Sequence, residues 1–74
     1  MFKIVDFDKL TDMGFIKDGF DYVYKTNIDG SLVKIFTVYA GSPYLRYSKT
    51  SYVSHQQLYC IYKWTMEKLI EWED

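Results

Sequence analysis

The chain of 74 residues carries a formal net charge of −1, and 49% of its residues are hydrophobic. This length and balance predict one globular domain, residues 1–74, and exclude a two-domain chain and a disordered one. We expect neither a signal peptide nor a membrane span, because no stretch is long and apolar enough for either. Cys60 is the one cysteine, and a free thiol without an export signal is typical of a cytoplasmic protein.

Aromatic residues make up 20% of the chain, as 8 Tyr, 5 Phe and 2 Trp. A domain of this size buries only about 60% of the surface of its unfolded chain, so its margin of stability is thin. Large rings compensate for this, because each can bury about 150–250 Å². We therefore assign eight rings to the core: Phe7, Phe15, Phe20, Tyr22, Tyr24, Phe36, Tyr62 and Trp72.

The first expected element is a short helix that begins at Asp6 or Asp8 and ends at Met13. An Asp side chain at this position can accept the free backbone N–H groups of a first helical turn. Gly14 follows, where a left-handed residue commonly ends a helix. One apolar stripe is expected to hold this helix against the rest of the fold, formed by Phe7, Leu10 and Met13.

Residues 15–26 alternate in the manner of a β-strand, with Gly19 marking a bend or a bulge. The segment 27–30 ends in Asp-Gly and predicts a tight hairpin turn. Residues 31–40 form the next strand, which is apolar on both faces and therefore suits a central position. Its alternation places Leu32, Phe36 and Val38 on one face and Val33, Ile35 and Tyr39 on the other.

After a turn at 41–43, residues 44–51 predict a third, polar strand at the edge of the sheet. Arg46 and Lys49 on such a strand would discourage pairing with a further strand.

The last expected element is a long helix over residues 54–72, which begins with Ser54 and Gln57 in the pattern of a capping box. One arc of this helix is apolar and is expected to pack on the sheet; it holds Leu58, Ile61, Tyr62, Thr65, Met66, Leu69 and Trp72. The opposite arc holds Cys60, Lys63, Trp64, Glu67, Lys68 and Glu71. The sequence thus predicts an α+β fold of order α-β-β-β-α, a three-stranded antiparallel sheet with the long helix on one face.

Residues that could carry catalysis or bind a metal are few. His55 is the one histidine, and it stands five residues before Cys60, so the two do not share one helical face. Nucleophilic triads and zinc sites need more such partners, and no glycine-rich phosphate loop is present. We therefore expect no enzymatic activity, no metal and no cofactor.

A Tyr-rich edge strand predicts a binding surface instead. Tyr and Arg are enriched at protein–protein interfaces. The alternative is that the same rings only cover the sheet within the monomer. Trp64 lies off the expected core arc, and an exposed Trp indicates an interface. The candidate partner-binding residues are Tyr44, Arg46, Tyr47, Lys49, Tyr52 and Trp64. The expected partner is another protein, and a homodimer is also open.

The alternative is a nucleic-acid-binding protein. Residues 31–66 contain four cations, Lys34, Arg46, Lys49 and Lys63, and no acidic residue. Tyr and Arg can stack on bases and hold phosphates. The overall charge of −1 argues against this alternative, because no bulk positive field attracts phosphate.

The order of motifs resembles that of small proteins encoded by bacteriophages and mobile elements of AT-rich hosts. The resemblance rests on Leu10, the pair Gly14-Phe15, the run Tyr22-Val23-Tyr24-Lys25, the apolar strand after it and the capped terminal helix. It implies a stand-alone binder, such as a host-takeover factor or an anti-CRISPR inhibitor of a defence nuclease. Many such inhibitors are acidic mimics of DNA, and the basic middle of this chain departs from that pattern.

Overall fold

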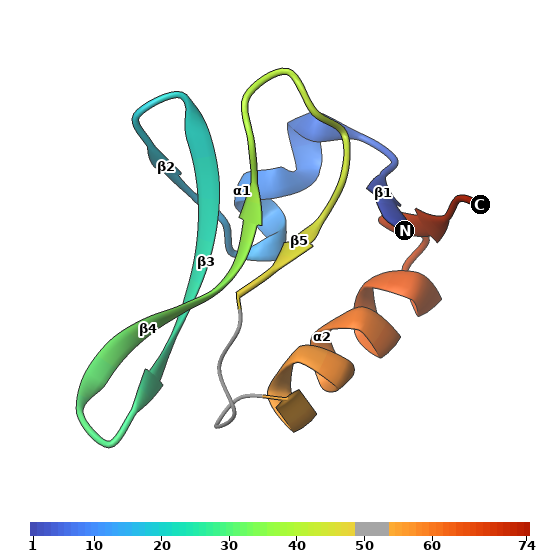
Figure 1. The fold of residues 1–74 in the computed structure, drawn as a ribbon. Helices are drawn as coiled ribbons and strands as arrows, with labels where there is room; N and C mark the ends of the chain where they lie inside the picture. The colour runs from blue at the N-terminus through green and yellow to red at the C-terminus, as the bar shows by residue number, and fades with distance from the viewer. Residues whose placement is uncertain (49–53) are drawn as a thin grey trace.

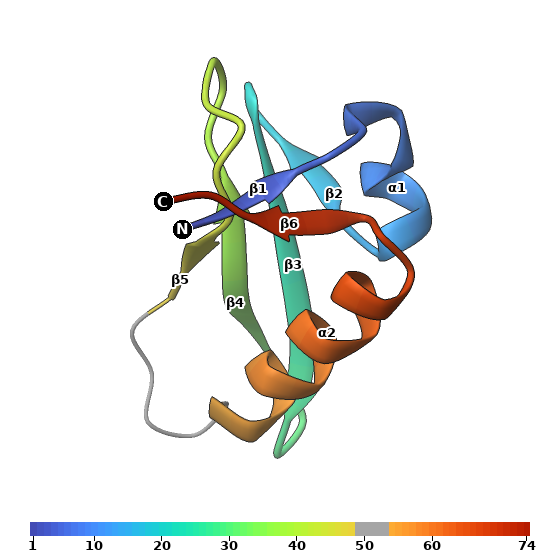
Figure 2. The same cartoon turned by 90° about the vertical axis from the view of Figure 1, so that its right-hand side faces the viewer.

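The computed structural model describes residues 1–48 and 54–74 and shows an α+β fold (Figures 1 and 2). Its main sheet is antiparallel, and its strands stand in the order β2-β3-β4-β5. These strands are β2 (Ile16–Asp18), β3 (Asp21–Ile28), β4 (Ser31–Val38) and β5 (Arg46–Tyr47). As predicted, β4 is an inner strand and β5 lies at the edge.

The remaining elements cover one face of this sheet. They are β1 (Phe2–Ile4), the 3₁₀ turn η1 (Phe7–Lys9), α1 (Leu10–Met13), α2 (Ser54–Met66) and β6 (Ile70–Trp72). β1 and β6 pair antiparallel as a two-stranded ribbon that crosses in front of the sheet beside α2 (Figure 2). No element within the described ranges covers the opposite face of the sheet. None of the described helices is long and apolar enough to cross a membrane.

The main sheet has four strands and not the predicted three, because the segment 15–26 folds back on itself. Gly19 adopts a φ of +63° in a turn that pairs β2 with β3, so it marks a hairpin and not a bend. Phe20 occupies the same turn and is 87% exposed, which makes its assignment to the core wrong. The predicted hairpin at 27–30 is confirmed, and the Asn27 side-chain oxygen accepts the Gly30 N–H at 3.0 Å.

A β-bulge at Ile35 changes which residues of β4 face the core. Lys34 and Phe36 pair with consecutive residues of β3, while Ile35 has no partner among the described residues of that strand. The extra residue reverses the alternation of side chains. Four residues therefore face the covered side of the sheet, namely Val33, Ile35, Phe36 and Val38. The predicted division of β4 into two faces is wrong for this reason, and Leu32 is exposed.

The N-terminal helix forms close to its predicted position, as η1 followed by α1. The Asp6 carboxylate accepts the Asp8 N–H at 3.0 Å, which is the expected cap. Gly14 ends α1 in the left-handed conformation, with a φ of +103°. Leu10 and Met13 are buried, but Phe7 is half exposed and lies outside the core, contrary to prediction.

α2 begins at Ser54 as predicted but ends at Met66, six residues early. Lys68 adopts a left-handed φ of +60°. The Leu69 N–H donates to the Trp64 carbonyl at 2.8 Å, and the Lys68 N–H donates to the Thr65 carbonyl at 3.1 Å. This pair of bonds is a Schellman motif. It ends α2 with Lys68 in the left-handed position that Gly usually occupies. The chain then turns back as β6, so residues 70–72 form a strand and not helix.

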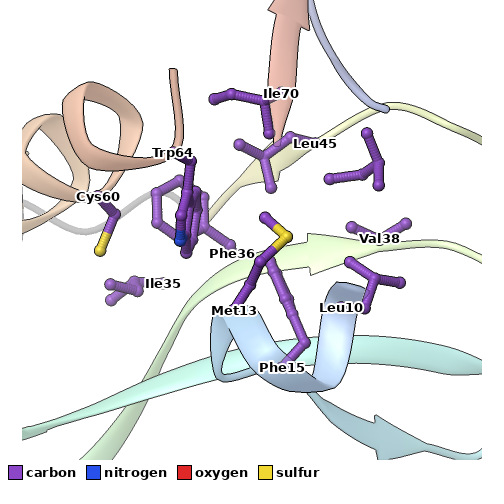
Figure 3. Close-up of a cluster of buried hydrophobic side chains, with 11 residues drawn as sticks. Leu10, Met13, Phe15, Ile35, Phe36, Val38, Leu45, Cys60, Trp64 and Ile70 are labelled. Carbon is purple, nitrogen blue, oxygen red and sulfur yellow. The ribbon is translucent and has the colours of Figure 1, made fainter. Parts of the chain in front are cut away.

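The rotation of α2 about its axis is opposite to the predicted one. Trp64 and Cys60, expected to face solvent, are buried in the core. Figure 3 shows both side chains pointing from α2 toward β4 and α1. The expected core arc faces outward instead, with exposed side chains at Leu58, Tyr62, Thr65, Met66 and Trp72. Ile61 and Leu69 lie at the border of the core and are partly buried.

Ring packing explains this rotation. The Trp64 ring lies 5.2 Å from Phe36, 5.5 Å from Phe15 and 5.5 Å from Tyr24, measured between ring centroids. One buried indole removes more apolar surface from water than a Leu or Met at the same place. Of the eight rings assigned to the core, Phe15 and Phe36 are buried and Tyr22 and Tyr24 are partly buried. The others are exposed in whole or in part, namely Phe7, Phe20, Tyr62 and Trp72.

Candidate protein-binding surface

Of the predicted site residues, Tyr44 has a structural role. Its backbone forms an antiparallel bridge with Lys3, next to the β1–β6 ribbon. Its hydroxyl donates to Oε1 of Glu73 at 3.3 Å. The Lys3 ammonium lies 3.4 Å from the Glu71 carboxylate and 3.8 Å from that of Glu73. Tyr44 therefore joins the start of β5 to both ends of the chain, and its ring is half-buried.

Tyr47 is the predicted site residue that the structure places on an open surface. Its ring is 51% exposed and stands edge-on to Phe36, with centroids 5.8 Å apart. Burial of its inner side raises the pKa of the phenol above the ordinary value of 10.0. Arg46 is exposed opposite Thr37 in the ladder, so its side chain belongs to the other face of the sheet. Lys49 and Tyr52 fall outside the described residues.

Trp64 is not part of any surface, so its assignment to a binding site is wrong. The side chain is 2% exposed and contacts three rings of the core. The predicted site is therefore divided, with Tyr44 and Trp64 in structural roles and Arg46 and Tyr47 at the surface.

Four large, exposed apolar side chains gather on the outward side of α2. We call Leu58, Tyr59, Tyr62 and Met66 the α2 surface. Each of them is 66–68% exposed. They are held outward because Cys60 and Trp64, on the opposite side of the same helix, are fixed in the core. At 3.6 residues per turn, Leu58, Tyr62 and Met66 form one strip along the helix.

An apolar groove continues this surface toward the sheet. It has a volume of about 450 Å³ and is lined by Phe2, Tyr47, Gln57, Leu58 and Ile61. A second hollow of about 460 Å³ shares Phe2 and Tyr47 with the first and extends to Met1, Leu45, Arg46 and Trp72. Phe2 and Trp72 meet edge to face at 5.2 Å between centroids. The exposed apolar surface thus runs from α2 across β5 to the β1–β6 ribbon.

The groove is anchored by a polar contact between α2 and the sheet. The Gln57 side-chain amide donates to the Ile35 carbonyl at 2.9 Å and to the Ser48 carbonyl at 3.2 Å. The first acceptor belongs to the bulge residue of β4, and the second follows β5. The Gln57 side chain, which also lines the groove, therefore bonds α2 to both β4 and the residue after β5.

Charge is sparse along this surface. In the sequence of α2, Lys63 is the one charged residue. Lys63 lies at the rim of the α2 surface, in a hollow that it shares with Tyr59, His55 and Cys60. The α2 surface itself offers two phenol hydroxyls as its polar groups, those of Tyr59 and Tyr62.

Cys60 is held as a neutral thiol. Burial raises its pKa above the ordinary value of 9.0, although a hydrogen bond with Tyr24 and the charge of Lys63 act in the opposite direction. A thiol with a raised pKa is a poor nucleophile, because the thiolate is the reactive form. Among the described residues, no three His, Cys, Asp or Glu side chains gather in a way that could hold a metal ion.

The described cations of segment 31–66 do not all lie on one face. Lys34 lies opposite Lys25 on the face of the sheet turned away from α2. Arg46 lies on the edge strand β5 opposite Thr37, which places it on the same face as Lys34, whereas Lys63 lies on α2. Lys49 falls outside the described residues. Nucleic-acid binding by this segment stays a prediction; of its described cations, Lys34 and Arg46 share the face of the sheet turned away from α2, and Lys63 does not.

A signal for the α2 surface was present in the sequence. The strip of Leu58, Tyr62 and Met66 is visible as an apolar arc, but the same helix carries Trp64 and Cys60 on its other side. This helix has apolar side chains on both arcs, but the main sheet can cover only one of them. The other arc is left exposed to solvent. That uncovered arc, and not the position of Trp64, marks the surface.

Comparisons of the chain with models of protein families, with curated proteins and with solved structures found no match. The resemblance to small phage-encoded proteins therefore stays a prediction.

Proposed function

We propose that this chain is a small, non-enzymatic protein-binding module whose contact is made by the α2 surface and the groove beside it. One observation carries the proposal: the apolar arc of α2, patterned as a core face, is turned to solvent. Exposed arcs of this kind are covered when a second polypeptide packs on them.

The size of the exposed surface supports the proposal. The four residues of the α2 surface, with Tyr47 and Trp72, are each 51–68% exposed. Together they offer on the order of 800 Å² of accessible area, taking about 200 Å² for each large side chain. The largest apolar patch on a typical monomer is about 300–600 Å². A specific interface buries about 800 Å² on each partner.

The composition of the surface supports the same conclusion. Tyr, Trp and Met are enriched in protein interfaces, while charged residues are depleted at their centres. The α2 surface and the groove follow this pattern, with Arg46 at the rim. The resemblance noted in the sequence adds a finer role, inhibition of a host defence protein, which would use this same contact.

The test is affinity capture from an extract of the source cells with matched variants. Wild type is expected to retain a polypeptide that the double variant Leu58→Lys/Tyr62→Lys loses. Leu32→Lys is the control, because Leu32 is equally exposed but lies on the other face of the sheet. The captured protein is then identified, purified and titrated against each variant by calorimetry. Equal affinity for wild type and the double variant would contradict the proposal.

A further inference from the structure

We infer that the partner of the α2 surface is a second copy of this chain, in a symmetric dimer whose two α2 helices pack antiparallel with Tyr62 at the two-fold axis. The inference rests on the proposed function and names its partner. Four properties of the surface point to it: its spacing, its lack of charge, its area and the small size of the domain.

The spacing of the strip is symmetric about Tyr62. Leu58 stands four residues before it and Met66 four residues after it, so the strip extends about 6 Å to each side at 1.5 Å per residue. A two-fold axis through Tyr62 therefore places Leu58 against Met66 of the partner subunit, and the reverse contact forms at the same time. This is the self-complementary arrangement that a two-fold interface requires.

The charge of the surface permits this pairing. A surface that meets its own copy meets its own charges, and like charges facing each other cost several kcal/mol in general. The four side chains of the α2 surface carry no charge, and the charged side chain of Lys63 lines the neighbouring hollow beside Tyr59, at the rim of this surface. Homodimer interfaces are also the most apolar class of protein contact.

The area agrees with a dimer of standard size. The α2 surface with Tyr47 and Trp72 supplies about 800 Å² on each subunit, which is the share that one partner contributes to a standard interface. Small domains commonly gain stability by such association, because one small core supplies little.

The first test measures the oligomeric state. Sedimentation velocity of wild type over a dilution series is expected to show a dimer that dissociates on dilution. Tyr62→Lys is expected to raise the dissociation constant at least about 100-fold, since two new charges enter each dimer. Leu32→Lys is expected to leave the dissociation constant unchanged. Far-UV circular dichroism checks that each variant keeps its fold.

The second test measures the packing of the helices. Tyr62→Cys places one new thiol from each subunit at the two-fold axis, where air oxidation is expected to join them. Leu58→Cys mixed with Met66→Cys is expected to join in the same way, and Leu32→Cys is not. The native Cys60 does not interfere, because it is buried and its pKa is raised.

The outcomes separate this inference from the proposed function. A dimer that survives Tyr62→Lys would overturn the inferred interface, and a dimer without the Tyr62→Cys cross-link would overturn its antiparallel packing. A wild-type monomer that still captures another protein through Leu58 and Tyr62 would overturn the dimer and leave the proposed function standing. A monomer that captures nothing through these residues would overturn both.

Discussion

At the residue scale, the ring of Trp64 has the largest influence on the molecule. It touches rings from β3, β4 and the segment after α1, and it joins α2 to all three. With that ring fixed inside, the side chains on the far side of the same helix turn outward. The exposure of Tyr62 is thus a consequence of the burial of Trp64 two residues later.

Replacement of Trp64 tests this role. Trp64→Ala is expected to lower the free energy of unfolding by about 3–5 kcal/mol, because it opens a cavity at the centre of the core. Trp72→Ala is the matched control, since Trp72 is 61% exposed. It is expected to cost less than about 1.5 kcal/mol, mainly through its edge-to-face contact with Phe2. Urea titrations at one protein concentration measure both, and equal losses would contradict the burial of Trp64.

Gly14 is the second residue with a sharp steric requirement. Its φ of +103° is unfavourable for any side chain, and an added Cβ would lie 2.8 Å from Cε2 of Tyr24. Gly14→Ala is therefore expected to destabilise more than Gly41→Ala, whose φ is +78° but whose surroundings are open. The shared backbone cost is about 1–2 kcal/mol, and the clash adds about 1 kcal/mol at Gly14. Thermal unfolding compares the two, and a smaller loss at Gly14 would argue against the close contact with Tyr24.

At the element scale, the bulge in β4 and the side chain of Gln57 act together. The bulge leaves the Ile35 carbonyl free to accept from Gln57, and the Ser48 N–H donates to the same carbonyl at 3.0 Å. The Ile35 carbonyl oxygen of β4 thus accepts from Gln57 of α2 and from Ser48, the residue after β5. Gln57 lines the groove between α2 and Tyr47, so this junction lies at its wall.

Gln57→Ala tests the junction. The variant leaves two half-buried backbone carbonyls without their side-chain donor, which is expected to cost about 1–3 kcal/mol. Gln56→Ala, at the neighbouring position of the helix, is expected to change stability by less than about 0.5 kcal/mol. Denaturant titration measures both losses. Amide hydrogen exchange at Ser48 is expected to speed up in Gln57→Ala alone, and unchanged exchange would count against the junction.

Local signals predicted most of the elements, while the features that depend on packing were missed. The cap at Asp6, the left-handed Gly14 and the hairpin at 27–30 each follow from the chemistry of one or two residues. The bulge at Ile35 does not, because its signal lies in the pairing of two strands. The end of α2 at Lys68 was also missed, since the left-handed residue there is Lys and not Gly.

Exposed aromatic side chains were predicted, but the structure places most of them on other residues than the predicted ones. Aromatic residues at an interface were expected, and Tyr47 does lie at an open surface. The rotation of α2 depends on which of its two apolar arcs fills the space above β4. Trp64 decides between the two arcs, because its large ring fills the space among three other rings. The hydrophobic periodicity of one helix carries no information about that space.

At the scale of the whole molecule, buried weak acids make stability depend on alkaline pH. Burial raises the pKa values of Tyr24, Tyr47 and Cys60 above their ordinary values of 10.0, 10.0 and 9.0. At Tyr24 the neighbouring Cys60 and Tyr59 add to this effect. The folded state therefore favours the neutral form of each group.

Stability is expected to be full below about pH 9 and to fall as the pH rises through the raised values, because only the unfolded chain then releases these protons readily. The urea midpoint measured from pH 7 to pH 11 checks this. Tyr24→Phe is expected to flatten the alkaline part of the profile, as it removes one of the three groups. A midpoint that stays constant or rises up to pH 11 would contradict the prediction.

The pairing of β1 with β6 is expected to be a late step in folding. Phe2 lies opposite Trp72, and Ile4 lies opposite Ile70, so the ribbon joins residues that are almost the whole length of the chain apart. Contacts of such long sequence separation are slow to form, because the closure of the intervening loop must come first. Residues 43–45 also bond to β1, through the Ile4 N–H to the Pro43 carbonyl and the Leu45 N–H to the Phe2 carbonyl, and they are made earlier than β6. We therefore expect the β1–β6 pairing to form after the β3–β4 hairpin, with Phe2 and Trp72 coming together late in folding.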